Sequence, residues 1–378
     1  MSCTTEARRR AGAWSLFVGM AVGCGASDAQ EESVAATVQE GFPAAVVEAL
    51  QRRDAALAGA AVSQADTSAL RRLHSVILLS KRWSPGQTVT VAFLGGDTVL
   101  HRKIQRVVER WSTVANLTFD FGDGDSGEFR RWSRTDADYG AHVRIAFDEV
   151  GYWSHVGTDA IDPDVAPASR PSMNLQDFDQ SLPDGWEATV LHEFGHAMAF
   201  EHEHQSPKGA CESEFRWEND AGYVPTPPGG EGGYRRDVSG RRPGIYTVLG
   251  GPPNEWEPSV VDYNLRKLRN TREIKASRFD RSSIMKYYLE PWMLVSGTRS
   301  SCYSRRSSSL SDGDRRAAAE EYPRDPAIAQ ANEAQIRKRI DATLDSLRLP
   351  GEVRRRLESG LDSARASQEV TNQKLLKR

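Results

Sequence analysis

The sequence has little of what marks membrane-spanning, nucleic-acid-binding or disulfide-rich proteins. It contains only four cysteines and eight histidines, and its net charge is −3 over 378 residues. That charge, without a concentrated basic face, does not favour a nucleic-acid partner, and we expect none. The apolar run from Ala11 to Cys24 is too short for a comfortable membrane span, so we expect no transmembrane segment.

The N-terminus has the layout of an export signal. Three arginines, Arg8 to Arg10, precede the apolar run, which predicts a secretory signal peptide over residues 1–29 with cleavage near Ala29. Alternatively, the sequence AVGC that ends at Cys24 resembles a bacterial lipobox, which would leave a lipid anchor on Cys24. The sequence therefore predicts a protein that is secreted, or lipid-anchored at a bacterial cell surface.

The cysteines agree with export. Cys3 would leave with the signal peptide, and Cys24 would leave with it or carry the lipid. Cys211 and Cys302 remain, and an even pair in an oxidising compartment predicts a disulfide between them. The alternative is two free thiols.

Histidines are concentrated in one short segment. Four of the eight lie in the 13 residues from His192 to His204, which read HEFGHAMAFEHEH. His192 and His196 are four residues apart, so on a helix both rings project from one face. Two imidazoles at that spacing can bind one Zn²⁺, and Glu193 beside them can accept a proton from a metal-bound water. Apolar neighbours and the Pro183–Gly185 turn favour a buried helix here.

His202 is the predicted third ligand, on one condition. On a continuous helix it would point about 240° around the axis from His196, so the helix must end near Ala199. If it does not, His202 would be a solvated histidine, and Glu201, Glu203 or His204 would bind in its place.

Two motifs together resemble those of a known enzyme family. HEFGHAMAFEHE is similar to the zinc signature of the metzincin metalloproteases, and specifically of the astacin-like branch. The segment SIMKY, residues 283–287, resembles the Met-turn of that branch. The resemblance covers residues 82–323, and it departs from the family at Ala199, where a glycine is usual. A residue with a Cβ costs about 1–2 kcal/mol in the left-handed conformation expected there.

The resemblance implies a catalytic centre with one zinc ion and a polypeptide substrate. Metal-activated water would attack the peptide bond, with Glu193 as general base and Tyr287 bound to zinc or stabilising the oxyanion. Ordinary core packing is the alternative for Tyr287. The implied zinc ligands are His192, His196 and His202, and Met285 forms the floor of the Met-turn.

The resemblance also implies an α+β, metzincin-like fold. It has a mixed sheet, an active-site helix, a second backing helix and an irregular lower subdomain. The predicted regions are the signal peptide 1–29, a pro-segment or N-terminal helical linker 30–80, the catalytic domain 81–323 and a C-terminal helical extension 324–378. In this family a pro-segment aspartate confers latency, but the expected motif is absent, and Asp54 and Asp66 are only guesses for its place.

Periodicity adds local predictions to this outline. Alternating apolar residues predict half-buried strands over 89–93 and 143–147, and the spacing of residues 104–111 predicts an amphipathic helix. Residues 151–160 correspond to a cleft-edge strand, with His155 a polar edge residue rather than a ligand. A helix is predicted over 310–323 and a helical hairpin beyond it. The glycine- and proline-rich stretch 221–256 would be a surface insertion or a wall of the cleft.

The motifs predict a zinc endopeptidase that is secreted or surface-anchored. A rival from another class is a catalytically degenerate relative that binds peptides or proteins without cutting them. Ala199 and the 221–256 stretch keep that alternative open. A hydrolase that is not a protease would use the same water activation.

Overall fold

The computed structural model describes residues 40–58, 79–123, 128–225, 236–252, 254–268, 278–347 and 351–377. The predicted signal peptide with Cys3, Cys24 and Ala29 lies outside these ranges, as does Asp66, and the 221–256 stretch is described in part. No helix within these ranges has both the length and the hydropathy of a membrane span.

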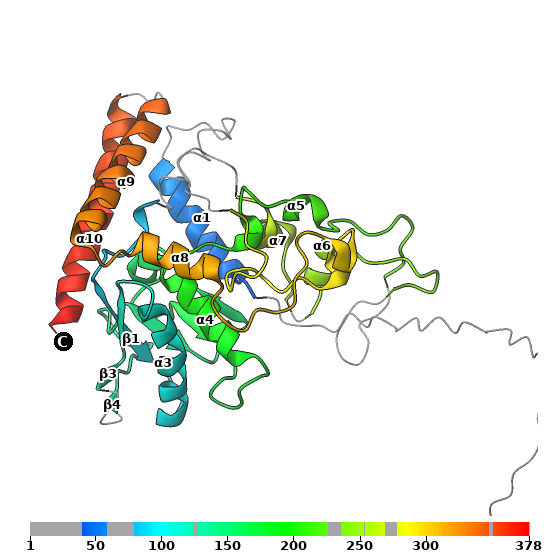
Figure 1. Ribbon diagram of the computed structural model, residues 1–378, viewed down its shortest axis with the longest axis horizontal. Coiled ribbons are helices and arrows are strands. Elements are labelled where there is room, and N and C mark those ends of the chain that lie inside the picture. The colour runs from blue at the N-terminus through cyan, green and yellow to red at the C-terminus, as the bar shows by residue number, and fades with distance from the viewer. Residues whose placement is uncertain are drawn as a thin grey trace, which may run out of the picture. The chain divides into compact units, whose positions relative to one another are not determined.

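A five-stranded mixed sheet forms one part of the fold, at the lower left in Figure 1, and with the helices confirms the α+β class. Four strands are parallel, and β6 pairs antiparallel to β7 at one edge in the order β2-β1-β5-β7-β6. Strands β3 and β4 pair antiparallel and form a separate two-stranded sheet. The strands are β1 Thr88–Phe93, β2 Thr118–Asp120, β3 Gly122–Asp123, β4 Glu128–Phe129, β5 Val143–Ala146, β6 Tyr152–Ser154 and β7 Met173–Leu175.

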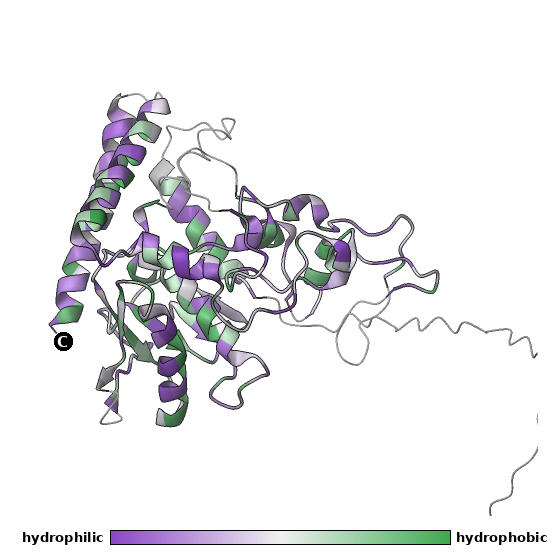
Figure 2. Cartoon of the chain, viewed as in Figure 1, coloured by the Kyte–Doolittle hydropathy of each residue, from purple (hydrophilic) through white to green (hydrophobic). Residues whose placement is uncertain are grey.

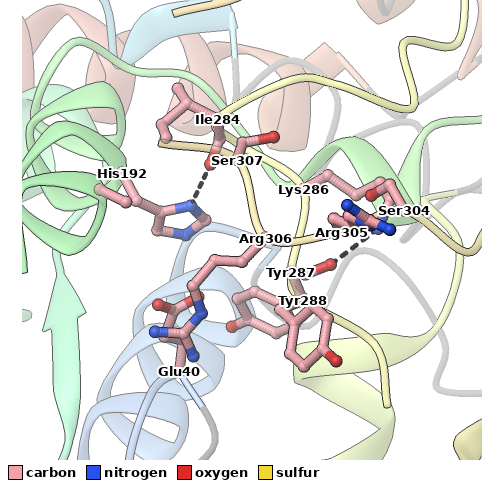
Figure 3. A pocket seen from close by; sticks show the side chains of 11 residues that line it. Glu40, His192, Ile284, Lys286, Tyr287, Tyr288, Ser304, Arg305, Arg306 and Ser307 are labelled. Atoms are coloured by element: carbon pink, nitrogen blue, oxygen red, sulfur yellow. Dashed lines mark hydrogen bonds between the residues drawn. The ribbon is translucent and has the colours of Figure 1, made fainter. Parts of the chain in front are cut away.

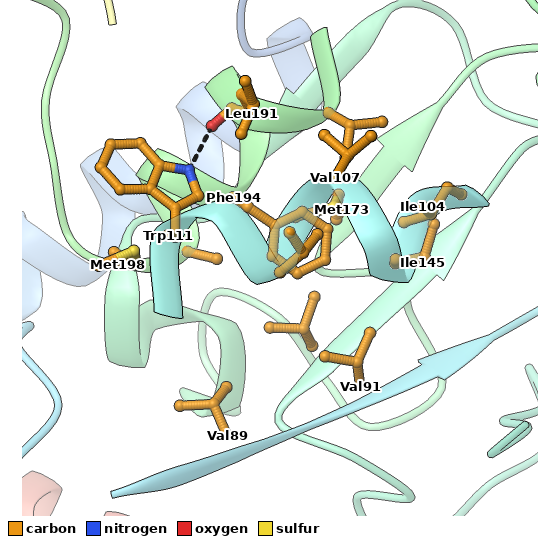
Figure 4. Close-up of a cluster of buried hydrophobic side chains, with 14 of the residues drawn as sticks. Val89, Val91, Ile104, Val107, Trp111, Ile145, Met173, Leu191, Phe194 and Met198 are labelled. Atoms are coloured by element: carbon orange, nitrogen blue, oxygen red, sulfur yellow. Dashed lines mark hydrogen bonds between the residues drawn. The ribbon is translucent and has the colours of Figure 1, made fainter. Parts of the chain in front are cut away.

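Two long helices, α3 (Thr98–Ser112) and α4 (Trp186–Ala197), pack against the sheet through the larger hydrophobic core. Asp97 starts α3 by accepting a hydrogen bond from the Leu100 amide at 2.8 Å. Figure 4 shows the Trp111 indole of α3 donating to the Leu191 carbonyl of α4, at 2.9 Å. This bond and the shared apolar packing fix α4, the helix of the histidine motif, against the backing helix.

Strand β1 is buried on both faces, whereas its alternation predicted a half-buried strand. Val89, Val91 and Phe93 face the helices, but Thr90 and Ala92 are also at most 2 % exposed. The second face is covered in part by the C-terminal helix α10 (Gly351–Leu376), which contacts β1, and in part by Trp132 and Ala141, which pack with Ala92. The sequence of β1 alone does not show that a distant helix covers its other face.

The other part of the fold is built around a second hydrophobic core and has mostly short helices. Cys211 and Cys302 form a disulfide within it, with a Cα–Cα distance of 5.3 Å, as predicted. Closing a loop of 91 residues contributes on the order of 4 kcal/mol in the chain-entropy model. The helices of this second part of the fold are α5 Cys211–Glu214, α6 Ile245–Leu249 and α7 Pro258–Leu265, with the 3-10 turns Glu203–Gln205, Pro291–Met293 and Gly297–Arg299. Within the 221–256 stretch, α6 therefore supplies regular structure and core residues.

The remaining helices come from the two ends of the described chain. The helix predicted over 310–323 is α8 (Asp312–Glu321), and the predicted hairpin is α9 (Pro326–Ser346) with α10. Polar residues dominate the outward surfaces of the hairpin (Figure 2). Helix α1 (Ala44–Ala58) is tied in by the buried Arg53, which pairs with Asp159 at 2.9 Å in the 3-10 turn Gly157–Ile161.

His142 joins the sheet to α10 and gives the fold a testable pH dependence. Its Nδ1 accepts from the Thr90 amide at 3.0 Å, and its Nε2–H donates to Asn372 Oδ1 at 2.8 Å. Burial lowers the pKa of His142 to about 4. Because the unfolded state then binds the proton more readily, stability is complete above pH 6.5 and falls as the pH drops towards 4.

We therefore expect His142→Gln to flatten the loss of unfolding free energy between pH 6.5 and 4. The difference from the wild type should reach about 3 kcal/mol at most. Urea unfolding of the chelator-treated protein at pH 7.0, 5.5 and 4.5 measures it. Parallel stability curves for the two proteins would show that His142 is not the responsible group.

Candidate metal centre

Helix α4 presents the first two histidines on a buried face. It begins after Gly185, whose φ of 75° suits glycine, at the predicted turn. His192 and His196 are each 3 % exposed, and their ring centroids lie 4.8 Å apart. The four-residue spacing therefore places both rings on one face of the helix, as predicted.

The helix ends where the third histidine requires it to end. Met198 is the C-cap of α4, and Ala199 has φ 67°, the left-handed conformation expected at this position. The Ala199 amide donates to the His196 carbonyl at 2.7 Å, and the Phe200 amide donates to the Gly195 carbonyl at 3.1 Å. This turn redirects the chain and brings His202 to the other two histidines.

The three histidines meet at a single point. His196 Nε2 lies 3.1 Å from His192 Nε2 and 2.9 Å from His202 Nε2. Within the described ranges this is the one group of three or more His, Cys, Asp or Glu side chains close enough to share a metal ion, with ligand atoms all within 4.8 Å. His204 and Glu203 are not members of the group.

The second nitrogen of each ring fixes which nitrogen carries the proton. His192 Nδ1 faces the Ile284 carbonyl at 2.7 Å, His196 Nδ1 faces the Phe200 carbonyl at 2.7 Å, and His202 Nδ1 faces an amide oxygen at 3.1 Å. Oxygen acceptors require Nδ1–H donors, so in the neutral rings all three Nε2 atoms carry lone pairs. Burial also lowers the pKa of His196 and His202 well below the usual value, which keeps both rings neutral.

This donor set fits a zinc ion. The Nε2 atom of His196 lies 3.1 Å from that of His192 and 2.9 Å from that of His202, and all three ligand atoms lie within 4.8 Å of one another. Their lone pairs repel, and a cation between them removes the repulsion. Zinc–nitrogen bonds of about 2.0–2.1 Å in a tetrahedron separate the nitrogens by about 3.3 Å, close to the observed spacing. Three neutral imidazoles also leave one tetrahedral position open, as in catalytic rather than structural sites.

Glu193 is buried beside the histidines. Its side chain is 1 % exposed, and Oε2 has no hydrogen-bond partner in the described part of the chain. Burial raises the pKa of this carboxyl well above its usual value, and the charge of Glu40 raises it further. A carboxylate with a raised pKa accepts protons more readily, although a nearby cation opposes the shift.

Tyr287 both packs and faces the centre, so the two sequence interpretations are compatible. It belongs to the second hydrophobic core, and its ring centroid lies 4.1 Å from that of His202. Its hydroxyl oxygen is buried without a hydrogen-bond partner among the described residues. Burial raises the pKa of Tyr287 well above its usual value, so the hydroxyl keeps its proton as a donor.

Met285 lies under α4, as the Met-turn motif predicts. A methyl group added at Gly195 would overlap the Met285 sulfur, so the sulfur packs directly against the helix backbone between the two ligands. The same turn orients the ligands through its backbone. The Ile284 carbonyl holds His192, and the Met285 carbonyl accepts from the Glu203 amide at 2.9 Å, next to His202.

Helix α8 holds the Met-turn in place. Asp314 accepts from the Ser283 hydroxyl at 2.6 Å and from the Ile284 amide at 2.9 Å. It is also the second member of a capping box with Ser311 at the start of α8. One buried carboxylate therefore connects the start of α8 to the turn that carries Met285.

Glu40 was not predicted from the sequence, yet it lines the cavity beside His192 and Tyr287 (Figure 3). The next amide, of Gly41, donates to the Tyr152 carbonyl on edge strand β6 at 3.2 Å. Asp54 instead pairs with its neighbour Arg53 on α1, at 2.8 Å. No motif around residue 40 indicated this placement, because it depends on contacts with residues more than 100 positions away.

His155 lies outside the group of three histidines, and it is not the polar edge residue that the sequence predicted. It is 2 % exposed and lies against Phe42 and Trp153. Edge strand β6 ends at Ser154, and the chain then enters the 3-10 turn Gly157–Ile161. His155 is therefore inside the second core, where burial lowers its pKa to about 3.

We expect Ala199→Gly to stabilise the protein by about 1 kcal/mol, because it removes a Cβ from a left-handed position. Zinc affinity should stay within about threefold of the wild type, since the turn is already formed. Chemical unfolding with and without zinc measures both quantities. A large gain in zinc affinity would mean that the alanine distorts the position of His202.

We expect Gly195→Ala to lower the unfolding free energy by about 1–3 kcal/mol through overpacking against Met285. Zinc binding should weaken as well, because the displaced turn also carries the carbonyl that orients His192. Gly351→Ala is the control, since its added methyl meets only the end of the Arg355 side chain, at 3.8 Å. Equal stability of the two variants would contradict the role given to Met285.

The comparisons with known proteins add three solved structures. No family model and no curated protein matches the chain. One structure of myroilysin is similar at 28% identity and a TM-score of 0.47, over 65% of this chain and 97% of that one. A second has 27% identity and a TM-score of 0.42, over 65% and 87%. High choriolytic enzyme 1, a hatching enzyme zinc-protease from the medaka fish Oryzias latipes, has 14% identity and a TM-score of 0.34, over 64% and 93%. By its two motifs, and by the three histidines above Met285, the chain resembles the astacin-like metzincin zinc metalloproteases.

Proposed function

We propose that the protein is a zinc-dependent endopeptidase that acts on polypeptides after export. One observation carries the proposal. Three imidazole nitrogens lie within 4.8 Å of one another, and the neighbouring side chains of Glu193 and Tyr287 each have a buried oxygen with no hydrogen-bond partner among the described residues. Polar atoms buried in this state are costly unless a ligand or a reaction uses them.

His192, His196 and His202 would hold the ion. Bound there, zinc supplies Lewis acidity and a lowered pKa for water. Glu193 takes the proton of the attacking water and returns it to the departing amine. Tyr287, protonated because of its raised pKa, donates a hydrogen bond to the oxyanion of the tetrahedral intermediate.

Strand β6 supports a polypeptide substrate. It is the edge of the sheet, and the Tyr152 carbonyl already accepts a hydrogen bond from a backbone amide, that of Gly41. An extended peptide can pair with such an edge through backbone hydrogen bonds, which demand little of its sequence. This feature also suits the rival function, a protein that binds peptides without cutting them.

Export is the other part of the proposal. The buried Cys211–Cys302 disulfide supports it, because disulfides persist in oxidising compartments. We propose residues 1–29 as the export signal, with release after Ala29 or a lipid on Cys24. The assignments of 30–80 as a pro-segment or linker, 81–323 as the catalytic region and 324–378 as an extension belong to the same proposal.

The test measures zinc content and casein hydrolysis on the same samples of wild type, Glu193→Gln and His202→Ala. We expect one zinc per wild-type chain and cleavage that chelation abolishes and zinc restores. Glu193→Gln should keep the zinc and lose about 10²–10⁴-fold in turnover. His202→Ala should lose both.

Other results would redirect the proposal. If the wild type binds zinc but does not cleave casein, the peptide-binding function is favoured. An affinity for peptides that Glu193→Gln leaves unchanged would favour it as well. A wild type that binds no zinc would remove the metal centre and the proposed reaction with it.

A further inference from the structure

Gln205 lies three residues after His202 and is almost completely buried, at 4 % exposure. It ends the 3-10 turn Glu203–Gln205, and its backbone amide donates to the His202 carbonyl at 3.1 Å. Its side chain extends away from this turn to the end of helix α7. Gln205 is therefore in contact with the third histidine and with a helix some 60 residues further along the chain.

The surroundings of Gln205 fix the orientation of its side-chain amide. Nε2 donates to the Tyr263 carbonyl at 2.8 Å and to the Arg266 carbonyl at 3.0 Å. Both carbonyls are at the C-terminal end of α7, where the last carbonyls of a helix lack partners within it. Because both N–H groups are used there, the oxygen Oε1 is left facing His202 Nδ1, at 3.1 Å.

His202 differs from the other two histidines in the group that accepts the hydrogen bond from its Nδ1. Backbone carbonyls hold the Nδ1 atoms of His192 and His196, and both rings stand on helix α4. His202 follows the left-handed turn at Ala199, outside that helix, and a side chain holds its ring. The third histidine therefore depends on Gln205 for a constraint that the first two receive from the main chain.

Helix α7 is a firm support for this contact. The Asn264 side chain clamps Phe42, accepting from its amide at 2.9 Å and donating to its carbonyl at 3.0 Å. On the outer side, the Tyr246 hydroxyl donates to Asp262 at 2.6 Å. His204 adds a second link, because its Nε2–H donates to the Asn264 carbonyl at 3.0 Å.

We propose that Gln205 is a positioning residue that sets the tautomer and ring orientation of His202 for metal binding, with α7 as its anchor. The inference rests on the proposed zinc centre. Removal of such an outer hydrogen bond to a metal-ligating histidine typically weakens metal binding 10- to 100-fold.

Two substitutions separate positioning from a merely structural role. Gln205→Glu keeps an oxygen acceptor for His202 but loses both donors to α7. Gln205→Leu loses the acceptor and the donors alike. We expect both variants to be less stable than the wild type without zinc. Gln205→Leu should bind zinc 10- to 100-fold more weakly, and Gln205→Glu should lose less because it keeps the acceptor for His202 although not the anchor on α7. Chelator competition gives the zinc affinity, and thermal unfolding in EDTA gives the stability of the metal-free full-length chain.

Tyr246→Phe is the control, because it removes two side-chain hydrogen bonds on the outer side of α7, to Asp262 and from Arg266. It leaves in place the Tyr263 and Arg266 carbonyls that accept from Gln205. It should lower stability and leave zinc affinity unchanged. The proposal is overturned if Gln205→Leu binds zinc as tightly as the wild type, or if Glu and Leu weaken binding equally. A wild type without zinc would instead refute the proposed function, so the two failures are distinguishable.

Discussion

The mutual repulsion of three imidazole nitrogens is the interaction on which the rest of the site depends. Neutral rings would not remain with their lone pairs about 3 Å apart unless other contacts held them. Those contacts come from three different segments: the Met-turn, the turn after α4 and the end of α7 through Gln205. The protein therefore prearranges a cation site, because a separate hydrogen bond and separate packing contacts hold each ring.

Because the ring supports come from both hydrophobic cores, the metal-binding arrangement depends on the sheet part of the fold and on the part around the second core together. Helix α4 belongs to the larger core, whereas Tyr287 belongs to the second one. The segment 283–287 passes between them, with Asp314 of α8 fixing one end and Met285 packing under α4. The metal centre is thus at the junction of two cores, and each core restrains a different wall of it.

The sequence predicted the local features of the site well and its distant supports poorly. The spacing of His192 and His196, and the helix end near Ala199, follow from helical geometry and are local properties of a dozen residues. The disulfide was predicted because only two cysteines remained. Gln205 was missed, although it is only three residues from His202, because the carbonyls that orient its side chain are 58 and 61 residues away. Glu40 was missed because the residues it lies beside are more than 100 positions away and no repeated pattern links them. The cover of β1 by α10 was missed for the same reason.

Helix α1 has a consequence for how the chain can be divided. Its Arg53 and the nearby Lys81 both pair with Asp159, which is 2 % exposed. A cut between residues 58 and 81 that released α1 would leave this interior carboxylate with one cation in place of two. Weaker compensation of a buried charge destabilises the folded state. Residue 81 can therefore begin the predicted catalytic domain without being a place where the folded protein can be divided.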